Sequence, residues 1–253
     1  MQPLISIITV CYNAGALLQR TIDSVVQQGY PNIEYIVIDG GSGLSTLEII
    51  ERNKARIQQV LIEKDNGIYD AMNKGLRIAK GDFVWFLNAG DLIYAHDTTE
   101  ILAKLIDDQV DIVYGDTMLV DDQYKEVGLR SVLTVHPLPE NLALHSMRFG
   151  MVVCHQSILV RRSIAPQYLL NNLSADIDWL IRSLQAANGK VVNAHLIICN
   201  YLMGGISKQK HQQSLKDRYV ILKHFFGFWP NIWNHCLIVL RAIWHRIVGK
   251  VKY

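Results

Sequence analysis

The feature that most constrains the fold is a repeated order of apolar runs and turns in the first third of the chain. Residues 4–11 and 33–38 are rich in β-branched side chains, and each run ends at polar residues and glycine. Helical periodicity follows each turn, over residues 16–28 and in a segment that Ser45 is expected to cap. Strands and helices that alternate in this way form a mostly parallel sheet with helices on both faces. We therefore predict an α/β fold.

The composition is that of a globular protein. Of the 253 residues, 50% are hydrophobic and 19% are charged, which suits one domain with a small appendage. The four cysteines are far apart and form no C-x-x-C pair, which favours a reducing, cytoplasmic location. No basic region precedes the first apolar run, and no run reaches about 18 residues. Neither a secretory signal nor a membrane span is expected.

Charge is distributed unevenly along the chain. The net charge is +2, but the residues from 206 onward contain nine Lys or Arg and one acid. The tail is therefore +8 and the preceding 205 residues are −6, which indicates an anionic partner surface. The tail also has a helical pattern of Trp and aliphatic residues, interrupted near Gly227 and Pro230. This pattern fits a helix packed on the body or one lying on a membrane surface, and the sequence leaves both open.

A stretch from Glu63 to Asp91 contains the densest local pattern. A turn over residues 65–67 precedes apolar residues at helical spacing, and Gly81 is expected to end that helix. Residues 83–87 predict a buried strand, which leads into an Asn-Ala-Gly-Asp tip. The tip places the Asp91 carboxylate at the carboxyl end of a strand, where open α/β sheets bind ligands.

Four carboxylates are expected at this edge of the sheet or in adjoining loops: Asp39, Asp65, Asp70 and Asp91. Such groups bind a ribose hydroxyl, a base N–H or a divalent cation. Each one alone is more commonly a turn or cap residue, but their combination favours a nucleotide site. The glycine-rich turn after Asp39 does not fit a dinucleotide fingerprint, and the chain has no phosphate loop. The sequence thus argues against a dehydrogenase or a P-loop enzyme.

The second half is expected to be less regular. A strand over residues 112–116 precedes stretches near 118–120 and 125–133 that look antiparallel. A strand is expected within 150–162, and a helix over 174–187 with Ser174 as its cap. Residues 191–201 predict the last strand.

Several motifs match one enzyme family in combination. They are S-I-I-T-V-C-Y-N, V-I-D-G-G-S, E-K-D-N-G-I-Y-D-A-M-N-K-G, F-L-N-A-G-D, C-H-Q-S, A-D-I-D-W-L-I-R and M-G-G-I-S. The chain resembles the inverting glycosyltransferases of family 2, which have the GT-A fold, over residues 4–207. It is similar to members that build bacterial surface polysaccharides such as colanic acid or O-antigen.

The resemblance implies a GT-A domain over residues 1–207 and a basic helical tail over 208–253. Within the domain, residues 1–116 form the nucleotide-sugar-binding half and 117–207 the acceptor half. The implied nucleotide-binding residues are Thr9, Tyr12, Asn13, Asp39, Asp65 and Asn66. Asp91 matches the last acid of a D-x-D-type signature and is expected to hold Mg²⁺ or Mn²⁺. The preceding acid is replaced in this chain, which leaves fewer protein ligands.

Asp176 matches the family's catalytic base, with Asp178 as the alternative. Both acids also suit the first turn of a helix, whose N-terminus favours negative charge. His155 and Gln156 match an H-Q step on the acceptor and diphosphate side, although a structural histidine is the alternative. Lys208 is expected to approach the diphosphate.

The implied function is transfer of a sugar from a UDP- or GDP-linked nucleotide-sugar to a glycan or lipid-linked acceptor in surface polysaccharide synthesis. The expected mechanism is a metal-assisted single displacement with inversion, at the inner face of the cytoplasmic membrane and with no nucleic-acid partner. One alternative is a catalytically idle nucleotide-sugar-binding scaffold, favoured by the reduced acidic tip and by Ala175 where the family often has Glu. Another is a nucleotidyltransferase, which would release pyrophosphate.

Overall fold

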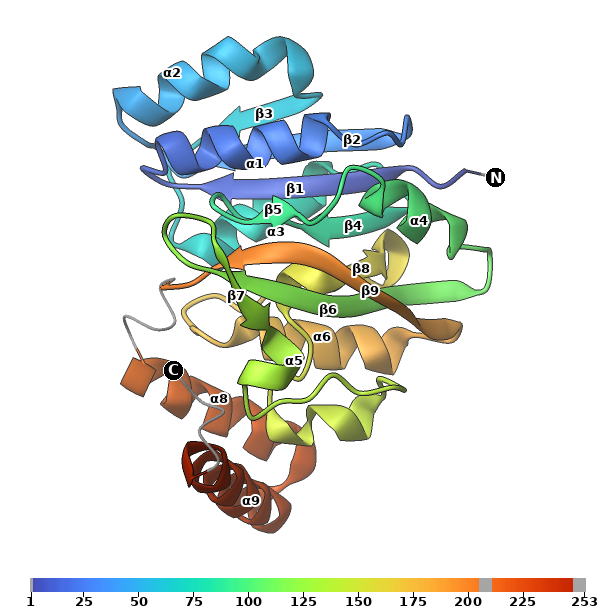
Figure 1. Ribbon diagram of the computed structural model, residues 1–253, viewed down its shortest axis with the longest axis vertical. Coiled ribbons are helices and arrows are strands. Elements are labelled where there is room, and N and C mark those ends of the chain that lie inside the picture. The colour runs from blue at the N-terminus through green and yellow to red at the C-terminus, as the bar shows by residue number, and fades with distance from the viewer. Residues whose placement is uncertain (1, 205–210, 248–253) are drawn as a thin grey trace.

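One continuous sheet organises the chain (Figure 1). The computed structural model describes residues 2–204 and 211–247. The strand order is β3-β2-β1-β4-β8-β6-β9-β5, and β7 pairs with β6 outside this path. The strands are β1 (Ile5–Cys11), β2 (Ile33–Asp39), β3 (Gln59–Ile62), β4 (Phe83–Phe86), β5 (Leu92–Ile93), β6 (Val110–Val120), β7 (Glu126–Leu129), β8 (Ile158–Arg161) and β9 (Lys190–Leu202).

Helices cover both faces of the sheet (Figure 1). The helices are α1 (Ala16–Val26), α2 (Leu44–Asn53), α3 (Ile68–Ile78), α4 (Thr98–Lys104), α5 (Arg130–Leu133), α6 (Ala175–Ala186), α8 (His211–Phe226) and α9 (Phe228–Ile247). Short 3₁₀ turns are η1 (Lys54–Arg56), η2 (Leu144–Phe149), η3 (His155–Ser157) and η4 (Arg162–Ile164). One apolar core joins α1, α2 and α4 to the sheet, and a second joins α3, α6 and α8 to its other face. The predicted α/β fold class is confirmed.

The pairing of the strands brings their functional ends to one edge. β1, β2, β3 and β4 are parallel, and Cys11 pairs with Asp39, which pairs with Ile62. β8 runs antiparallel between β4 and β6, so its first residue lies beside the end of β4. β9 is parallel to β6. This edge, called the carboxyl edge below, therefore collects the ends of six strands and the start of β8.

The second half differs from the prediction in its strands. Residues 112–116 and 118–120 belong to one long strand, β6, which pairs with β9 along its length. The predicted division between residues 116 and 117 lies inside that strand. The expected antiparallel pair exists between β6 and β7, but residues 130–133 form the short helix α5. The predicted boundary at 207 lies outside the described residues.

Of three local predictions about helix ends, two were wrong and one was confirmed. Ser45 lies inside α2, whose N-cap is Gly43. Ser174 is the N-cap residue of α6, as predicted, but its hydroxyl donates to the Ser214 carbonyl (3.0 Å) and makes no capping hydrogen bond. Gly81 lies beyond the end of α3, and a Cβ there would lie 2.6 Å from Ser6 Oγ. Glycine is required at 81 because the chain passes close to β1.

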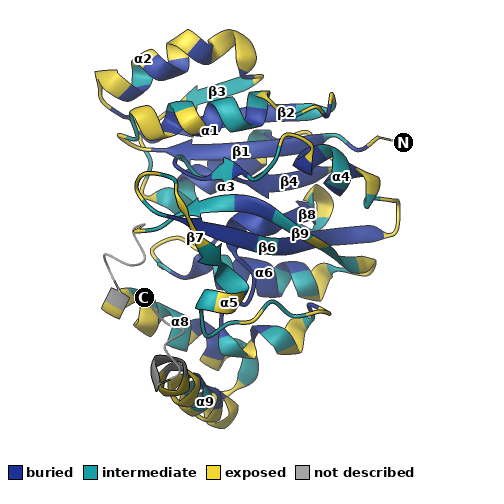
Figure 2. Ribbon diagram, in the orientation of Figure 1, coloured by how far each residue is buried: buried dark blue, intermediate teal, exposed yellow. Residues whose placement is uncertain are grey.

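The tail packs on the body through α8. Ile221 and Leu222 are buried in the α3–α6 core, and the Asp217 carboxylate accepts the Leu173 amide (2.8 Å). α9 lies against α8 and leaves its outer face exposed (Figure 2). None of the helices in the described ranges is long and apolar enough to cross a membrane. Packing on the body is thus observed for α8, and one face of α9 stays open.

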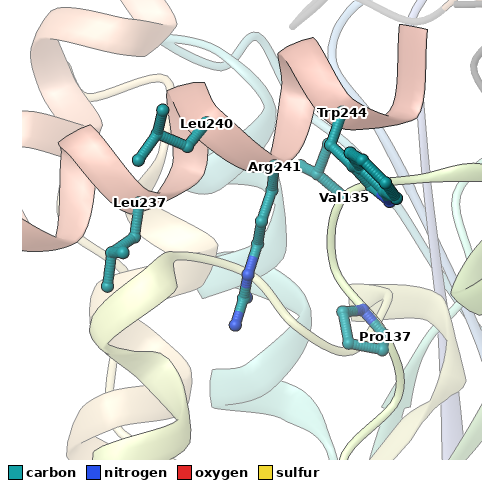
Figure 3. A pocket seen from close by; sticks show the side chains of 6 residues that line it. All are labelled: Val135, Pro137, Leu237, Leu240, Arg241 and Trp244. Carbon is teal, nitrogen blue, oxygen red and sulfur yellow. The ribbon is translucent and has the colours of Figure 1, made fainter. Parts of the chain in front are cut away.

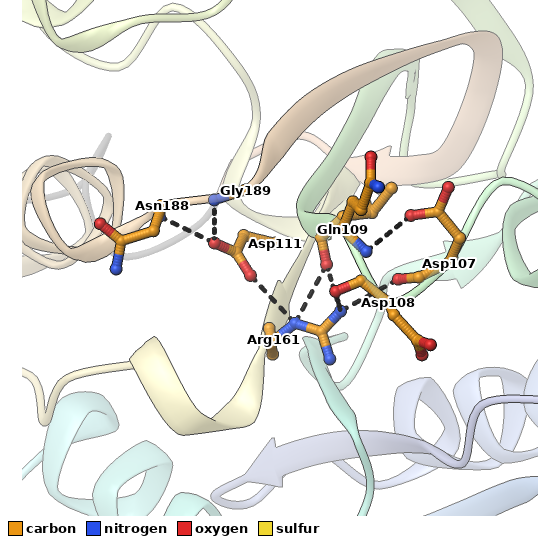
Figure 4. A network of polar contacts seen from close by, with 8 residues as sticks. Asp107, Asp108, Gln109, Asp111, Arg161, Asn188 and Gly189 are labelled. Atoms are coloured by element: carbon orange, nitrogen blue, oxygen red, sulfur yellow. Dashed lines mark hydrogen bonds and ion pairs between the residues drawn. The ribbon is translucent and has the colours of Figure 1, made fainter.

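A polar network holds the opposite edge of the sheet (Figure 4). The Arg161 guanidinium donates to the Val110 carbonyl (Nη2, 2.6 Å) and contacts the Asp111 carboxylate (2.9 Å). Asp111 also accepts the amides of Asn188 and Gly189 (2.9 and 2.7 Å). These contacts tie the end of β8 to the start of β6 and to the turn before β9.

We predict that Arg161→Gln lowers the free energy of unfolding by about 2–3 kcal/mol, because Asp111 loses its charged partner in a partly buried site. Denaturant titration measures this change. The matched control is Arg56→Gln, whose exposed pair with Asp23 contributes about 0.5 kcal/mol or less. Equal losses in both variants would contradict this role of the network.

Candidate active site

Asp39 shapes the turn that joins β2 to α2. Its Oδ1 accepts the Gly41 and Ser42 amides (3.0 and 2.9 Å), and its Oδ2 accepts the Ser42 hydroxyl (2.5 Å) and the Cys11 thiol (3.4 Å). The Ser42 hydroxyl oxygen in turn accepts the Asn13 amide (2.7 Å). A carboxylate has about four lone-pair positions, so this buried group is fully used within the protein. Its first role is to fix the loops after β1 and β2.

Asp65 lies directly over this turn. A Cβ on Gly40 would lie 2.2 Å from Asp65 Oδ2, so only glycine at 40 admits the carboxylate. Asp65 Oδ1 accepts the Gly67 amide (2.9 Å), while Oδ2 has no hydrogen-bond donor among the described residues. Asp65 is half-buried, whereas Tyr12 and Asn66 are exposed. Asp65 Oδ2 therefore lies against Gly40 and is not used by a donor among the described residues.

Asp91 lies at the end of the β4 tip and is buried. Its Oδ1 accepts the Leu202 amide at the end of β9 (3.0 Å). Burial raises the pKa of Asp91 well above its usual range, and the neighbouring Cys154 raises it further. Tyr124 covers this tip by donating to the Gly90 carbonyl (2.9 Å). A cation would be favoured here because it offsets the cost of a buried carboxylate.

The donors near Asp91 fit a hard divalent cation. The described chain has no group of three or more His, Cys, Asp or Glu side chains arranged for a metal. However, the side-chain oxygens of Asn88 and Asn200 are buried without a hydrogen-bond partner. Asn88 belongs to the Asp91 tip, and Asn200 pairs with Leu92 in the adjoining ladder. Carboxylate and amide oxygens, completed by phosphate and water, are suitable ligands for Mg²⁺ or Mn²⁺.

Asp176 begins helix α6 at the same edge. Burial raises its pKa from 3.8 to about 6, partly opposed by hydrogen bonds from the Ile177 amide and the Tyr69 hydroxyl and by the charge of Arg130. The Tyr69 hydroxyl lies 3.4 Å from Asp176 Oδ1 and 3.3 Å from the Leu173 carbonyl. A half-buried carboxylate with a pKa near 6 is ionised at neutral pH and is a competent proton acceptor.

Asp178 is a poorer base although it lies two residues away. It is buried and forms an ion pair with Arg182, one turn along α6. The Arg182 Nε donates to Asp178 Oδ2 (2.7 Å), and its guanidinium also donates to the Gln167 carbonyl. Asp178 is thereby committed to holding α6, and the geometry favours Asp176.

Tyr69 is a site residue that sequence reasoning missed. It sits in the first turn of α3, and its ring stacks on Tyr168 (5.4 Å), which stacks on Trp179 (5.1 Å). The stack fixes the hydroxyl beside Asp176. The two residues are separated by 107 positions, so no local spacing reveals the contact. The Asp178–Arg182 spacing of four residues was a readable signal for the pairing of Asp178.

Two predicted site residues lie inside the protein. The Thr9 side chain is buried, and its hydroxyl accepts from the Tyr35 hydroxyl (3.2 Å). His155 is buried among Phe86, Tyr168 and Trp179, and its Nε2 pairs with the Tyr168 hydroxyl (2.6 Å). Burial lowers the pKa of His155 to about 4, so the ring is neutral at physiological pH. We leave the side chains of Thr9 and His155 out of the candidate site.

The remaining predicted residues are placed differently. Gln156 is buried, and it partly offsets the rise that burial causes in the pKa of Asp91. Asp70 accepts the Asn66 amide (3.0 Å) and belongs to the turn before α3. Lys208 lies outside the described residues. The carboxyl edge thus brings the Asp39–Asp65 turn, the Asp91 tip and Asp176 together around one sheet edge.

This arrangement suits displacement chemistry on a phosphorylated substrate. A free carboxylate oxygen at Asp65 offers an acceptor for the N–H or O–H groups of a nucleoside. The oxygens at the Asp91 tip suit a cation that neutralises phosphate, and Asp176 offers a base at neutral pH. The three groups come from three separate segments: Asp65 precedes α3, Asp91 follows β4, and Asp176 lies in the first turn of α6.

Comparison with known proteins is consistent with this geometry. The sequence model described as "Glycosyl transferase family 2" matches residues 6–169. A "PGL/p-HBAD biosynthesis glycosyltransferase" of Mycobacterium bovis is 31% identical over 98% of this chain and 93% of its own length. An uncharacterized glycosyltransferase of Haemophilus influenzae is 32% identical over 50% of this chain and 52% of its own length.

Solved structures share the fold at low sequence identity. S. aureus TarS 1-349, in complex with UDP-GlcNAc, matches with a TM-score of 0.70 and 18% identity over 87% of this chain. The chain spans 65% of that TarS chain. The mannosyltransferase PcManGT from Pyrobaculum calidifontis, in complex with GDP-Man and Mn²⁺, matches with a TM-score of 0.66 and 15% identity, over 98% of this chain and 76% of its own. Both agree with the predicted GT-A fold.

We predict that Asp176→Asn stabilises the protein in a pH-dependent way. The native pKa of about 6 exceeds the ordinary 3.8, so ionisation costs folding free energy at pH 8, where both states are charged. Because the group is partly exposed, we expect a gain of about 1–2 kcal/mol at pH 8. The gain should shrink as pH falls from 6 to 4, where wild type also becomes neutral. Denaturant titrations at both pH values measure it, and a constant difference would contradict the raised pKa.

Proposed function

We infer the reaction from one premise: the chain belongs to glycosyltransferase family 2, as its family match and its near-full-length relative show. We propose that it transfers a sugar from a UDP- or GDP-linked nucleotide-sugar to a hydroxyl acceptor with inversion at the anomeric carbon. The observation that carries this proposal is the Asp176 carboxyl, with a pKa of about 6, at the same sheet edge as the Asp39–Asp65 turn and Asp91.

The donor nucleotide would lie over the ends of β1, β2 and β3. Asp65 Oδ2 accepts a base or ribose donor there, and Asn13 and Tyr12 border the same turn. Asp39 contributes by holding that turn in shape. UDP-GlcNAc in TarS and GDP-Man in PcManGT support a nucleotide-sugar as the donor class. Both neighbours share the fold at 18% and 15% sequence identity, and we propose either UDP or GDP as the nucleotide of the donor.

A divalent cation belongs to the proposal. When bound, Mg²⁺ or Mn²⁺ supplies charge neutralisation to the departing diphosphate. Asp91, with the side-chain oxygens of Asn88 and Asn200, would hold it. The Leu202 amide orients the Asp91 carboxyl by donating to its Oδ1. The Mn²⁺ in the PcManGT complex supports this choice of cation.

Asp176 performs the proton transfer. Its carboxylate takes the proton of the acceptor hydroxyl while that oxygen forms a bond to the anomeric carbon and the nucleoside diphosphate leaves. The Tyr69 hydroxyl and the Ile177 amide both donate to Asp176 Oδ1 and so orient the carboxylate. Because the acceptor oxygen attacks directly, the anomeric configuration is inverted.

We propose a lipid-linked glycan acceptor, in bacterial surface glycan synthesis at the inner face of the cytoplasmic membrane. α9 supports membrane contact because it contains no acid and exposes Trp229, Trp233, Val239, Leu240, Ile243 and Trp244. A helix with exposed Trp and aliphatic side chains and basic neighbours lies well on an anionic leaflet.

We predict that UDP- or GDP-sugars raise the melting temperature of the protein when Mn²⁺ is present, because ligands that bind only the folded state stabilise it. Asp65→Asn should weaken the nucleotide effect, and Asp91→Asn should remove the dependence on Mn²⁺. Glu48→Gln, an exposed acid on α2, is the matched control and should behave as wild type. A thermal-shift panel of nucleotide-sugars measures all three. No donor-dependent shift with any nucleotide-sugar would overturn the donor site.

We predict that Asp176→Asn lowers kcat for sugar transfer by about 10²–10⁴-fold, the usual contribution of a general base. Asp178→Asn should instead lower the free energy of unfolding by about 1–3 kcal/mol, since Arg182 loses its partner. Steady-state transfer assays and denaturant titrations separate the two effects. Donor binding without transfer in wild type, on every acceptor tested, would favour the idle scaffold.

We predict that Tyr69→Phe shifts the acidic limb of the kcat/KM pH profile upward by about half a unit, because the lost hydrogen bond favoured ionised Asp176. The wild-type limb should lie near pH 6, with activity rising as the base ionises. Tyr94→Phe, at the strand edge near α4, serves as the control. An unchanged profile would show that Tyr69 does not act on the base.

A further inference from the structure

Three arginines converge on one short segment beside the candidate site. Arg241 lies over the Phe149 ring (4.6 Å), and the Arg218 Cδ lies 3.3 Å from the position of a Cβ on Gly150. The Arg130 guanidinium donates to the carbonyls of Met151 and Val152. The arginines come from α5, α8 and α9, so the folded tail supplies two of the three.

No carboxylate forms a direct ion pair with this cluster of Arg130, Arg218 and Arg241 within the described part of the chain. Arg218 Nε and His136 Nδ1 are buried without hydrogen-bond partners. Burial, with the charges of the three arginines, lowers the pKa of His136 to about 3. Converging cations with unused donors repel one another, so a bound anion would stabilise them.

An apolar cavity adjoins the cluster (Figure 3). It has a volume of about 490 Å³ and is lined by Val135, Pro137, Leu237, Leu240, Arg241 and Trp244. In Figure 3, Arg241 extends from α9 toward the body between Leu237 and Pro137. We call this cavity the tail pocket. Its size suits a small ligand, and Arg241 joins its apolar lining to the cluster of charges.

The tail pocket lies on the side of the proposed base. Arg218 directly follows Asp217 on α8, and Asp217 accepts the amide of Leu173 (2.8 Å), three residues before Asp176. The segment contacted by the arginines continues directly into Cys154 and Gln156. A ligand held at the arginines is therefore positioned on the acceptor side of the site.

We propose that the tail pocket binds the acceptor lipid, with a phosphate group at Arg130, Arg218 and Arg241 and the aliphatic chain against Trp244 and Leu240. Guanidinium groups bind phosphate through paired, charge-assisted hydrogen bonds, and burial of a chain on apolar side chains adds affinity. The combination selects an amphiphile with a phosphorylated head. This inference rests on the proposed lipid-linked acceptor.

The test is titration of the full chain with farnesyl phosphate, without donor, followed by calorimetry or tryptophan fluorescence. We expect Arg241→Gln and Arg218→Gln each to weaken binding about tenfold or more, as expected for loss of a charged hydrogen bond. Trp244→Ala should weaken it by a comparable factor. Arg241 is exposed, so its variant is expected to fold even if Arg218→Gln does not.

Two matched controls come from the same chain. Trp229→Ala removes an exposed Trp of α9 that does not line the pocket, and Arg52→Gln removes an exposed arginine on α2. Both should bind farnesyl phosphate as wild type does. Equal losses in Trp229→Ala and Trp244→Ala would indicate general partition of amphiphiles onto α9 and would overturn the pocket.

The probe itself separates the remaining explanations. If inorganic phosphate binds as tightly as farnesyl phosphate, the aliphatic chain makes no contribution. If farnesol binds as tightly, the phosphate makes none. Either result would overturn the assignment of a lipid phosphate to the pocket. Binding of nucleotide-sugar with Mn²⁺ is measured on the same variants. If wild type binds the donor but not farnesyl phosphate, this inference alone fails. It also fails alone if the arginine and Trp244 variants bind farnesyl phosphate as tightly as wild type does. If donor binding is absent from wild type, the proposed function fails independently of the lipid result.

Discussion

The site depends on carboxylates buried at one edge of the sheet. Burying a charge is costly unless donors or counter-ions compensate it. Asp39 receives four donors and therefore acts as a structural group that sets the loops after β1 and β2. Asp91 and Asp176 receive fewer, and burial raises the pKa of each. The incomplete compensation leaves one group suited to a cation and the other suited to a proton.

The first half of the fold follows from the sequence because its interactions are local or regularly repeated. β1 and β2 are buried on both faces, which is why continuous β-branched runs identified them. The Asp39, Asp65 and Asp91 positions follow because parallel strands place their carboxyl ends together. The predicted apolar stripe of α3 was incomplete, since Asn73 and Lys74 are also buried. Asn73 donates to the Tyr168 carbonyl (3.0 Å), a partner that periodicity does not reveal.

The second half was harder to predict because its order depends on contacts between distant segments. β8 enters between β4 and β6 with reversed direction, and β6 continues as one strand because β9 pairs along it. The contact between Tyr69 and Asp176 depends on these pairings. His155 illustrates the same difficulty, since a His-Gln motif does not indicate that Phe86, Tyr168 and Trp179 enclose the ring. Residue identity suggested the chemistry. Only the fold shows that Asp178 is paired with Arg182 while Asp176 is not, and that aromatic rings enclose His155.

The body and the tail of the molecule carry opposite net charges. The body carries −6 and several of its carboxylates gather at the carboxyl edge, whereas the tail carries +8 and contributes Arg218 and Arg241 beside Phe149 and Gly150. α8 is anchored to α6 through Ser174, Leu173 and Asp217, so the tail's position is coupled to the helix that begins with Asp176. A change that loosens α8 would disturb both Asp176 and the arginine cluster. The helix α8 is thus an integral part of the folded body and not a separate appendage.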